Sequence, residues 1–387
     1  MLRRAVPCGC SADTRAGHDA GETPIEGQPN YSLESEAAGP RILAPDLPYR
    51  PRQVEAGEVT IGLIGCGGIA ETHLTAYRRA GYHVLVLCDR TREKAERYRE
   101  RFYPEARVTS DYRDVIDDPA VRFVDLTPYP DDRAPLIEES LLAGKHVLSQ
   151  KPLTTDLAVG ERLVELADRQ GVKLAVNQNG RWAPHFSYAR EAVRAGWLGQ
   201  LTAIRQSVRW DHNWVRDLPF NDIHDLVLHD FGIHWFDFVV SLLGPKTVRR
   251  VYASVTHSPA QLARPPLLAQ VVMDAPQCQV SLTFDADTRW SAWDQTTLIG
   301  TSGVLHSAGR DLNHQTLSMT IAEGVCRPSL EGQWFPDGFH GAMAELVWAA
   351  ETGAEPLHGA RENLSSLALC AAAIASARTG EPVVPVR

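Results

Sequence analysis

The stretch Val59-Thr60-Ile61-Gly62-Leu63-Ile64-Gly65-Cys66-Gly67-Gly68-Ile69-Ala70 predicts a buried strand that turns through glycines directly into a helix. A second apolar run, from Val84 to Cys88, ends at Asp89, roughly twenty residues further along the chain. Together these features match the G-x-G-x-x-G/A pattern of dinucleotide-binding folds, with Ala70 in the third small position. We therefore expect this part of the chain to bind a dinucleotide.

Each small residue of the turn has a physical role in holding such a cofactor. Gly65 makes the tight turn, Gly67 lets the backbone approach a pyrophosphate, and Ala70 lets the helix pack closely on the strand. The first turn of the helix also offers free N–H groups and the positive end of its dipole to the phosphates. The residues expected to hold this part of the cofactor are Gly65, Gly67, Gly68, Ile69 and Ala70.

The residues after the second strand bear on the choice of cofactor. Asp89 can accept hydrogen bonds from both hydroxyls of an adenosine ribose and would repel a 2′-phosphate, which favours NAD over NADP. Because of Arg90, NADP remains an alternative cofactor, since an arginine at this place can stack on adenine or hold a 2′-phosphate.

Length and composition limit the class of protein. A chain of 387 residues is long enough for two domains, and its hydrophobic fraction of 44% and charged fraction of 22% are ordinary for a soluble globular protein. A net charge of −9 argues against nucleic acid as a partner, and no apolar run approaches the ~18 residues of a membrane span. Seven scattered cysteines argue against a disulfide framework.

The first 57 residues read as an extension, either disordered or draped over the fold. No apolar segment follows Arg3 and Arg4, so we expect no export signal and a cytoplasmic protein. Residues 43–51 could lie extended on a neighbouring surface. Cys8 and Cys10 could in principle bind a metal, but two thiols without further ligands are expected to be inert.

From residue 58 to 178, short apolar runs alternate with amphipathic stretches, which predicts a Rossmann domain with a parallel, doubly wound sheet. Ligands bind at the carboxyl ends of the strands of such a sheet. Two further segments, Thr127-Pro128 and Gln150-Lys151-Pro152, then join the same rim. The expected strands are Thr60–Ile64, His83–Cys88, Phe123–Leu126, His146–Leu148 and Lys173–Val176.

Residues 179–387 predict a second, α+β domain for substrate binding and oligomerisation. A helix at His185–Ala195 precedes a long strand at Leu201–Trp210, and later short runs are typical of a largely antiparallel sheet with one covered face. Two helices, near Gly341–Thr352 and Arg361–Arg378, close the chain.

The segment from His229 to Ser241 predicts an apolar helix with a polar stripe. At about 100° per residue, Asp230, His234 and Asp237 fall within about 60° of one another. The spacing lets the Asp230 carboxylate accept from one imidazole nitrogen of His234, leaving the other free to take a proton. The alternative is an Asp–His pair that only stabilises the core and has no catalytic role.

Lys151 follows an expected strand at the rim where a nicotinamide ring would lie. A lysine by itself is usually a solvated surface charge. At this rim its ammonium could polarise a substrate oxygen and stabilise a developing alkoxide.

With these motifs in place, the chain from about Glu58 to its end resembles the Gfo/Idh/MocA oxidoreductases, which include glucose–fructose oxidoreductase and inositol dehydrogenases. The resemblance rests on residues 65–70, on residues 144–152 and on Asp230-x-Gly232-x-His234-x-x-Asp237. It also implies a homodimer or homotetramer formed through the open face of the C-terminal sheet.

The resemblance implies an NAD(P)-dependent dehydrogenase acting on CH–OH groups, with a sugar, sugar derivative or inositol as the small polyhydroxylated substrate. Lys151, Asp230 and His234 would then be catalytic: His234, oriented by Asp230, takes the hydroxyl proton while Lys151 holds the reacting oxygen. Two alternatives stay open. One is transient oxidation that permits elimination or glycoside cleavage, and the other is a non-catalytic dinucleotide-binding sensor.

One position departs from the family pattern. Gln150 stands where the family usually has Glu, which keeps the hydrogen bonding but removes a charge. The residues expected near the rest of the cofactor are Asp89, Arg90, Thr127, Pro128, Gln150 and Lys151.

Polar and aromatic residues after two strands are expected to bind the substrate's hydroxyls and ring faces. A polar interdomain turn and a strand-end loop explain the same residues about as well, and residues 334–339 form a weaker third candidate. No metal is expected, because the spacing of His212, His229 and their polar neighbours matches no strong ligand pattern. The expected substrate-binding residues are Asn179, Arg181, Trp182, Trp210, His212, Asn213 and Asp237.

Overall fold

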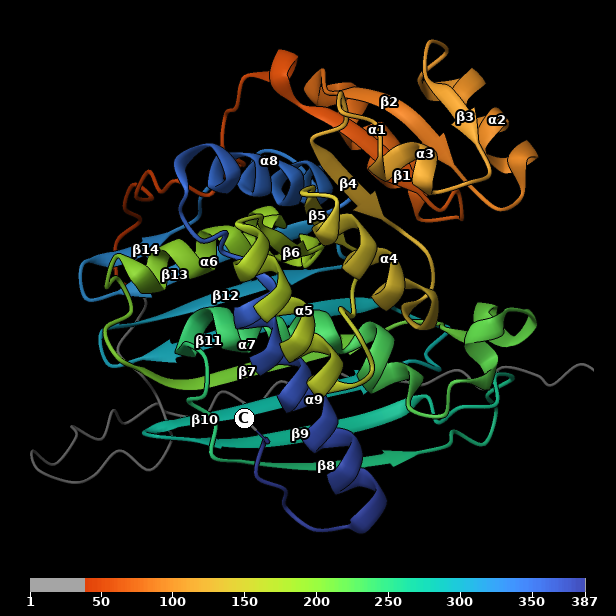
Figure 1. The fold of residues 1–387 in the computed structure, drawn as a ribbon. Coiled ribbons are helices and arrows are strands. Elements are labelled where there is room, and N and C mark those ends of the chain that lie inside the picture. Colours follow the sequence, from red (N-terminus) through yellow and green to blue (C-terminus); the bar gives the residue numbers. More distant parts are fainter. Residues whose placement is uncertain (1–38, 387) are drawn as a thin grey trace, which may run out of the picture. The chain divides into compact units, whose positions relative to one another are not determined.

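The computed structural model describes residues 39–386, so the expectations for Cys8, Cys10 and the rest of residues 1–38 lie outside the described residues. The described chain contains a six-stranded and an eight-stranded sheet (Figure 1). The first is a parallel Rossmann sheet and the second is mostly antiparallel, as the sequence predicted.

In the smaller sheet the strands run in the order β3-β2-β1-β4-β5-β6, with parallel pairing throughout. The order reverses between β1 and β4, and ligands bind at such a reversal. The strands are β1 (Thr60–Ile64), β2 (His83–Cys88), β3 (Arg107–Thr109), β4 (Phe123–Leu126), β5 (His146–Ser149) and β6 (Leu174–Val176). The helices between them are α1 (Ala70–Ala80), α2 (Arg92–Phe102), α3 (Arg113–Ile116), α4 (Pro130–Leu142) and α5 (Leu157–Gln170).

The ends of α5 illustrate how local sequence places these helices. The Asp156 carboxylate accepts the Ala158 N–H at 2.8 Å, which satisfies one of the free donors of the first turn. At the other end Gly171 has φ 66°, the left-handed conformation that ends a helix and that glycine adopts without strain.

The larger sheet has the order β14-β13-β12-β11-β7-β10-β9-β8, and β7 and β10 are its one parallel pair among the described strands. Its strands are β7 (Leu201–Arg209), β8 (Arg250–Thr256), β9 (Leu268–Ala275), β10 (Cys278–Asp285), β11 (Trp293–Gly300), β12 (Gly303–Gly309), β13 (Gln315–Ile321) and β14 (Gly324–Cys326). The expectations did not include β3, β8, β12 and β14. Two of these have only three residues and β12 has glycine at both ends, so their form depends on neighbouring strands.

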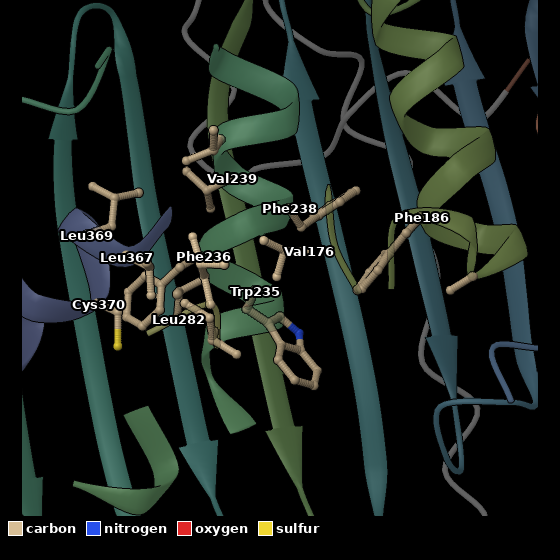
Figure 2. Close-up of a cluster of buried hydrophobic side chains, with 14 of the residues drawn as sticks. Val176, Phe186, Trp235, Phe236, Phe238, Val239, Leu282, Leu367, Leu369 and Cys370 are labelled. Carbon is tan, nitrogen blue, oxygen red and sulfur yellow. The ribbon is translucent and has the colours of Figure 1, made fainter. Parts of the chain in front are cut away.

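Helices cover one face of the larger sheet (Figure 1). They are α6 (Pro184–Arg194), α7 (Ile233–Leu243) and α9 (Ala360–Thr379), while α8 (Asp337–Thr352) packs against α1 of the Rossmann part. Figure 2 shows part of the resulting core, where Phe236 of α7 and Leu282 of β10 lie beside Leu367 of α9. The same hydrophobic cluster includes Val176 of β6, so apolar packing continues from one sheet to the other.

The described part of the expected extension follows an extended course over the larger domain. Ile42 donates its N–H to the Val325 carbonyl at 3.0 Å, and the Val325 N–H returns a bond to Pro40 at 2.9 Å. Leu47 and Tyr49 are buried. This segment therefore contributes to the core in addition to crossing the surface. Among the described residues, no helix combines the length and the apolar character needed to cross a membrane.

Candidate active site

The glycine turn joins the ends of β1 and β4. Gly65 has φ +100°, and a Cβ built there would lie 2.8 Å from Thr127 Oγ1 and 2.9 Å from Pro128 Cδ. The Thr127 hydroxyl in turn donates to the Ile64 carbonyl at 3.2 Å. Only glycine fits a position with both this backbone conformation and this close approach.

The next two glycines face open space. A Cβ at Gly67 or Gly68 would meet no atom within 4 Å, so a phosphate can approach the backbone there. The first turn of α1, which begins at the buried Ala70, supplies free N–H groups and the positive dipole end. These residues therefore fit the pyrophosphate of a dinucleotide.

Asp89 lies beside this turn, at the end of β2. Its Oδ2 accepts the Cys66 N–H at 2.7 Å and its Oδ1 accepts the Thr91 N–H at 2.8 Å, so the carboxylate is held at the rim. Arg90 is 87% exposed and pairs with Asp132 at 3.0 Å. The residue oriented next to the turn is therefore the acid, which is the arrangement that favours NAD.

Lys151 reaches across from the Rossmann rim to the other domain. Its Nζ donates to Asp230 Oδ1 at 2.8 Å and to the Asp230 carbonyl oxygen at 2.7 Å. Burial alone would raise the pKa of the Asp230 carboxyl, but Lys151 outweighs it and the net pKa is lowered. Asp230 is therefore ionised at neutral pH, and the pair carries no net charge.

The expected hydrogen bond between Asp230 and His234 is not formed, and this part of the sequence reading was wrong. Residues Val227–Phe231 form a π-helical turn (η5), in which Gly232 donates to the Val227 carbonyl at 2.7 Å. The wider turn breaks the regular i to i+4 relationship on which the expectation depended. His234 Nδ1 is buried without a hydrogen-bond partner among the described residues, and burial, followed by Lys151, lowers the His234 pKa to about 3.

His212 lies near the ion pair, close enough to interact electrostatically with Asp230 and Lys151. Its Nδ1 accepts the indole N–H of Trp210 at 2.8 Å, so the neutral ring carries its proton on Nε2. Burial lowers the His212 pKa to about 4; Asp230 acts against this shift and Lys151 adds to it. Trp210 itself stacks on Phe231 with ring centres 3.9 Å apart. These contacts bring His212 and Trp210 to the catalytic candidates.

The other residues expected to bind substrate are buried, and most of their polar groups bond to other parts of the protein. Asp237 forms a two-point ion pair with Arg181, at 2.6 and 2.9 Å, and both side chains are almost fully buried. Asn213 uses its amide on Asp211, on Asp287 and on two backbone N–H groups. With their polar groups engaged or enclosed, these side chains have little left to offer a ligand. The residues concerned are Asn179, Arg181, Trp182, Asn213 and Asp237, and their role in substrate binding stays a prediction.

One residue near the site, Arg133, was not predicted from the sequence, and a second belongs to the weaker third candidate. Arg133, on α4, is buried and donates to the Lys151 carbonyl at 3.3 Å and to the Pro152 carbonyl. Asp131 and Asp132 precede it, and such acidic residues are typical of a solvated first turn of a helix. Trp334, part of the weaker third candidate, lies with its ring 5.5 Å from His234 and donates its indole N–H to Asn179 Oδ1 at 2.6 Å.

The fold and the rim define a dinucleotide-binding oxidoreductase, and comparison with known proteins agrees. Residues 59–178 match the family described as oxidoreductase family, NAD-binding Rossmann fold, and residues 186–306 match the GFO/IDH/MocA C-terminal domain. The chain belongs to the Gfo/Idh/MocA oxidoreductase family, whose N-terminal domain is an NAD-binding Rossmann fold.

Similar proteins include two curated dehydrogenases. D-apiose dehydrogenase of Paraburkholderia graminis is 27% identical over 335 residues, which cover 83% of this chain and 88% of that protein. Inositol 2-dehydrogenase of Rhizobium meliloti is 25% identical, over 82% of this chain and 96% of that protein. Among solved structures, an oxidoreductase from Agrobacterium radiobacter in complex with NAD+, L-tartaric acid and magnesium has a TM-score of 0.76 at 20% identity, covering 84% of this chain and 98% of that chain.

Proposed function

We propose that this enzyme oxidises a CH–OH group of a sugar, sugar derivative or inositol, with Lys151, Asp230 and His234 as catalytic residues. The observation that carries the proposal is the ion pair of Lys151 and Asp230, which joins the cofactor rim to the second domain. Asp230 uses two of the three N–H groups of Lys151. The third can donate to a substrate oxygen.

Bound NAD supplies the hydride acceptor at this rim. Lys151 would stabilise the negative charge that develops on the substrate oxygen, and Asp230 would hold the ammonium in place. His234 is uncharged at neutral pH because its pKa is low, so it has a nitrogen lone pair for the hydroxyl proton. Such a weak base would hold that proton only briefly.

A neutral, polyhydroxylated substrate suits the charges of the site. Lys151 and Asp230 balance each other, and the pKa values of about 4 for His212 and about 3 for His234 leave both rings uncharged. These four side chains together add no net charge that would favour a phosphate or carboxylate. The Nε2–H of His212 can donate to a hydroxyl, and the names of the two curated relatives indicate the same substrate class.

We also propose that the uncovered face of the larger sheet joins copies of the chain into a dimer or tetramer. Tyr252 of β8 and Val272 of β9 are directly paired, and are 45% and 48% exposed. Large apolar side chains at neighbouring positions of an open face favour self-association. Light scattering should give a multiple of the chain mass, and Val272→Arg should reduce it. A native chain that is monomeric at micromolar concentration would contradict this proposal.

The test of the activity is a screen of sugars, sugar acids and inositols, including D-apiose and myo-inositol, with NAD and with NADP. Absorbance of the reduced cofactor reports turnover. We expect at least one sugar or inositol to reduce NAD, and Lys151→Ala and His234→Ala to be folded but slow. Normal turnover by both variants would exclude the assigned roles.

Two other results would favour the alternatives. Cleavage of a glycoside without accumulation of NADH would indicate redox-neutral chemistry. Tight NAD binding with no turnover of any polyol would indicate a sensor.

A further inference from the structure

We propose that Gln150 presents an N–H donor, held in one direction by a buried hydrogen-bond chain, to an oxygen on the nicotinamide half of the cofactor. The inference deepens the proposed function and rests on it for the placement of the reacting end of the cofactor at this rim. Gln150 would be a positioning residue for the cofactor.

The backbone sets the orientation of the Gln150 amide. The N–H of Lys151 points at the side chain of Gln150, with 2.9 Å between Lys151 N and Gln150 Oε1. A backbone N–H requires an acceptor, and an amide nitrogen has no lone pair to accept with. The atom at this place must therefore be the oxygen, which assigns Nε2 to the other side of the amide.

The same reasoning extends along the chain of contacts. Asn177 approaches Gln150 Oε1 at 3.2 Å, so the approaching atom must be the nitrogen Nδ2. This Nδ2 also lies 3.2 Å from His73 Nε2, which must then be the unprotonated ring nitrogen. The proton of the neutral ring is consequently on Nδ1, which donates to Asp125 Oδ2 at 2.7 Å.

The hydrogen bonds at Asp125, the other end of this series, fix the donor and acceptor of every bond in it. Tyr77 donates its hydroxyl to the same Asp125 oxygen at 2.6 Å, and burial and Asp125 raise the Tyr77 pKa, so this donor keeps its proton. A carboxylate can only accept, so every bond from Gln150 to Asp125 has a defined direction. Asp125, His73 and Asn177 are fully buried, which keeps water from substituting for any link.

One donor of Gln150 is left over. Nε2 has no acceptor within the described part of the chain, and it is not among the fully enclosed side-chain atoms, so it keeps access to the rim. A glutamate at this position would present a second acceptor oxygen there. Glutamine presents an N–H donor there in place of an acceptor. The partner of this donor must be an oxygen with a free lone pair.

The order of the strands indicates which part of the cofactor lies opposite. The turn after β1 suits the pyrophosphate, and Asp89, after β2 on one side, suits the adenosine ribose. The other half of the dinucleotide must extend the opposite way, over β4 and β5. Gln150 directly follows β5, so Nε2 faces a ribose hydroxyl or the carboxamide oxygen of the nicotinamide riboside.

Binding titrations of the full chain without substrate test this directly. Gln150→Leu should weaken NADH binding about 3- to 10-fold, as for the loss of one hydrogen bond, and should leave ADP binding unchanged because ADP lacks the nicotinamide riboside. Gln206→Leu is the matched control, since it places the same change at a buried glutamine in β7. If Gln150→Leu does not fold, Gln150→Met replaces it as the test variant, because methionine has a similar length and no N–H donor.

Two further variants decide the details. Gln150→Glu should keep NADH affinity if the partner is a ribose hydroxyl, which can donate to a carboxylate, and should lose more than Gln150→Leu if the partner is the carboxamide oxygen. Asn177→Leu should weaken NADH but not ADP, because the amide could then turn. Unchanged NADH binding by Gln150→Leu, or an equal loss for ADP, would overturn the proposal. Because no polyol is present, a failure of the proposed oxidation would leave these results standing.

Discussion

The ammonium of Lys151 lies 2.8 Å from Asp230 Oδ1, although the two residues are 79 positions apart in the chain. Lys151 follows β5 of the Rossmann sheet, and Asp230 belongs to the π-helical turn before α7. One ion pair therefore connects the domain that holds the cofactor to the domain that supplies the proposed base. Both side chains are only partly exposed, so water screens the pair less than a surface pair.

Removing the ammonium should slow the chemistry far more than it weakens cofactor binding. For Lys151→Met we expect kcat to fall about 100- to 1,000-fold, the loss typical for one group that stabilises a developing oxyanion. Affinity for NADH should change little. Steady-state kinetics and a binding titration measure the two effects. Arg169→Met, at an exposed cation of α5, is the control and should behave like the native chain.

The pH profile should not contain a titration of His234 near its ordinary value. A histidine is uncharged above its pKa, and burial lowers this pKa to about 3, so the neutral form persists throughout the usual assay range. We expect kcat/KM for oxidation to show no fall from this group between about pH 8 and about pH 5. An inflection near pH 6.5 in the native enzyme that disappears in His234→Asn would contradict this expectation.

Two glycines of the cofactor turn should respond differently to the same substitution. Gly65→Ala places a methyl 2.8 Å from Thr127 Oγ1 at φ +100°, and should cost about 1–3 kcal/mol of stability. Gly67→Ala meets no protein atom and should unfold like the native chain, yet bind NADH more weakly because the methyl occupies the phosphate's approach. Chemical denaturation and NADH titration separate these effects. Equal stability losses would refute the distinction.

The buried pair of Arg181 and Asp237 should matter for stability more than for substrate recognition. Asp237→Ala removes the two-point partner of the buried Arg181, which keeps Glu362 at 2.9 Å, and should cost up to about 3 kcal/mol of unfolding free energy. Asp217→Ala removes the partner of the exposed Arg216 and should cost less than about 1 kcal/mol. If Asp237→Ala is as stable as the native chain but raises the KM for substrate, the prediction that Asp237 binds substrate would be supported.

Asp294 should make the protein less stable as the pH rises. Burial raises the Asp294 pKa to about 7, whereas an unfolded aspartate titrates near pH 3.9. Between these values the folded chain holds the proton more tightly, so the unfolding free energy falls with increasing pH and stays lower above about pH 7. Asparagine removes this titration and can still accept the bond that Gln315 donates at 3.0 Å.

We therefore expect Asp294→Asn to gain about 1–3 kcal/mol over the native chain at pH 8 and almost nothing at pH 4. Denaturant titrations at the two pH values measure the difference. A gain of the same size at both would show that ionisation of Asp294 is not its cause.

Much of the Rossmann part could be predicted from short-range patterns. The observed β1, β2 and β4 have the expected bounds, since continuous apolar runs are visible within a few residues. The rim could also be predicted, because the carboxyl ends of parallel strands share one edge. The helix with the catalytic candidates was predicted less well. Its sequence has helical spacing throughout, but the chain inserts a π-helical turn before Gly232.

By itself, the sequence determined that a parallel sheet would end in a glycine turn suited to a dinucleotide, and that Asp89 would stand next to it. A strand, a turn and a positive φ each depend on residues that are adjacent in the sequence, so a short stretch of sequence is enough to predict them. The tertiary structure decided which charges meet. It paired Asp230 with Lys151 instead of His234, enclosed Arg181 with Asp237, and linked Gln150 to Asp125 through Asn177 and His73. Buried polar groups must find partners within hydrogen-bond distance, and that distance depends on packing and not on spacing along the chain.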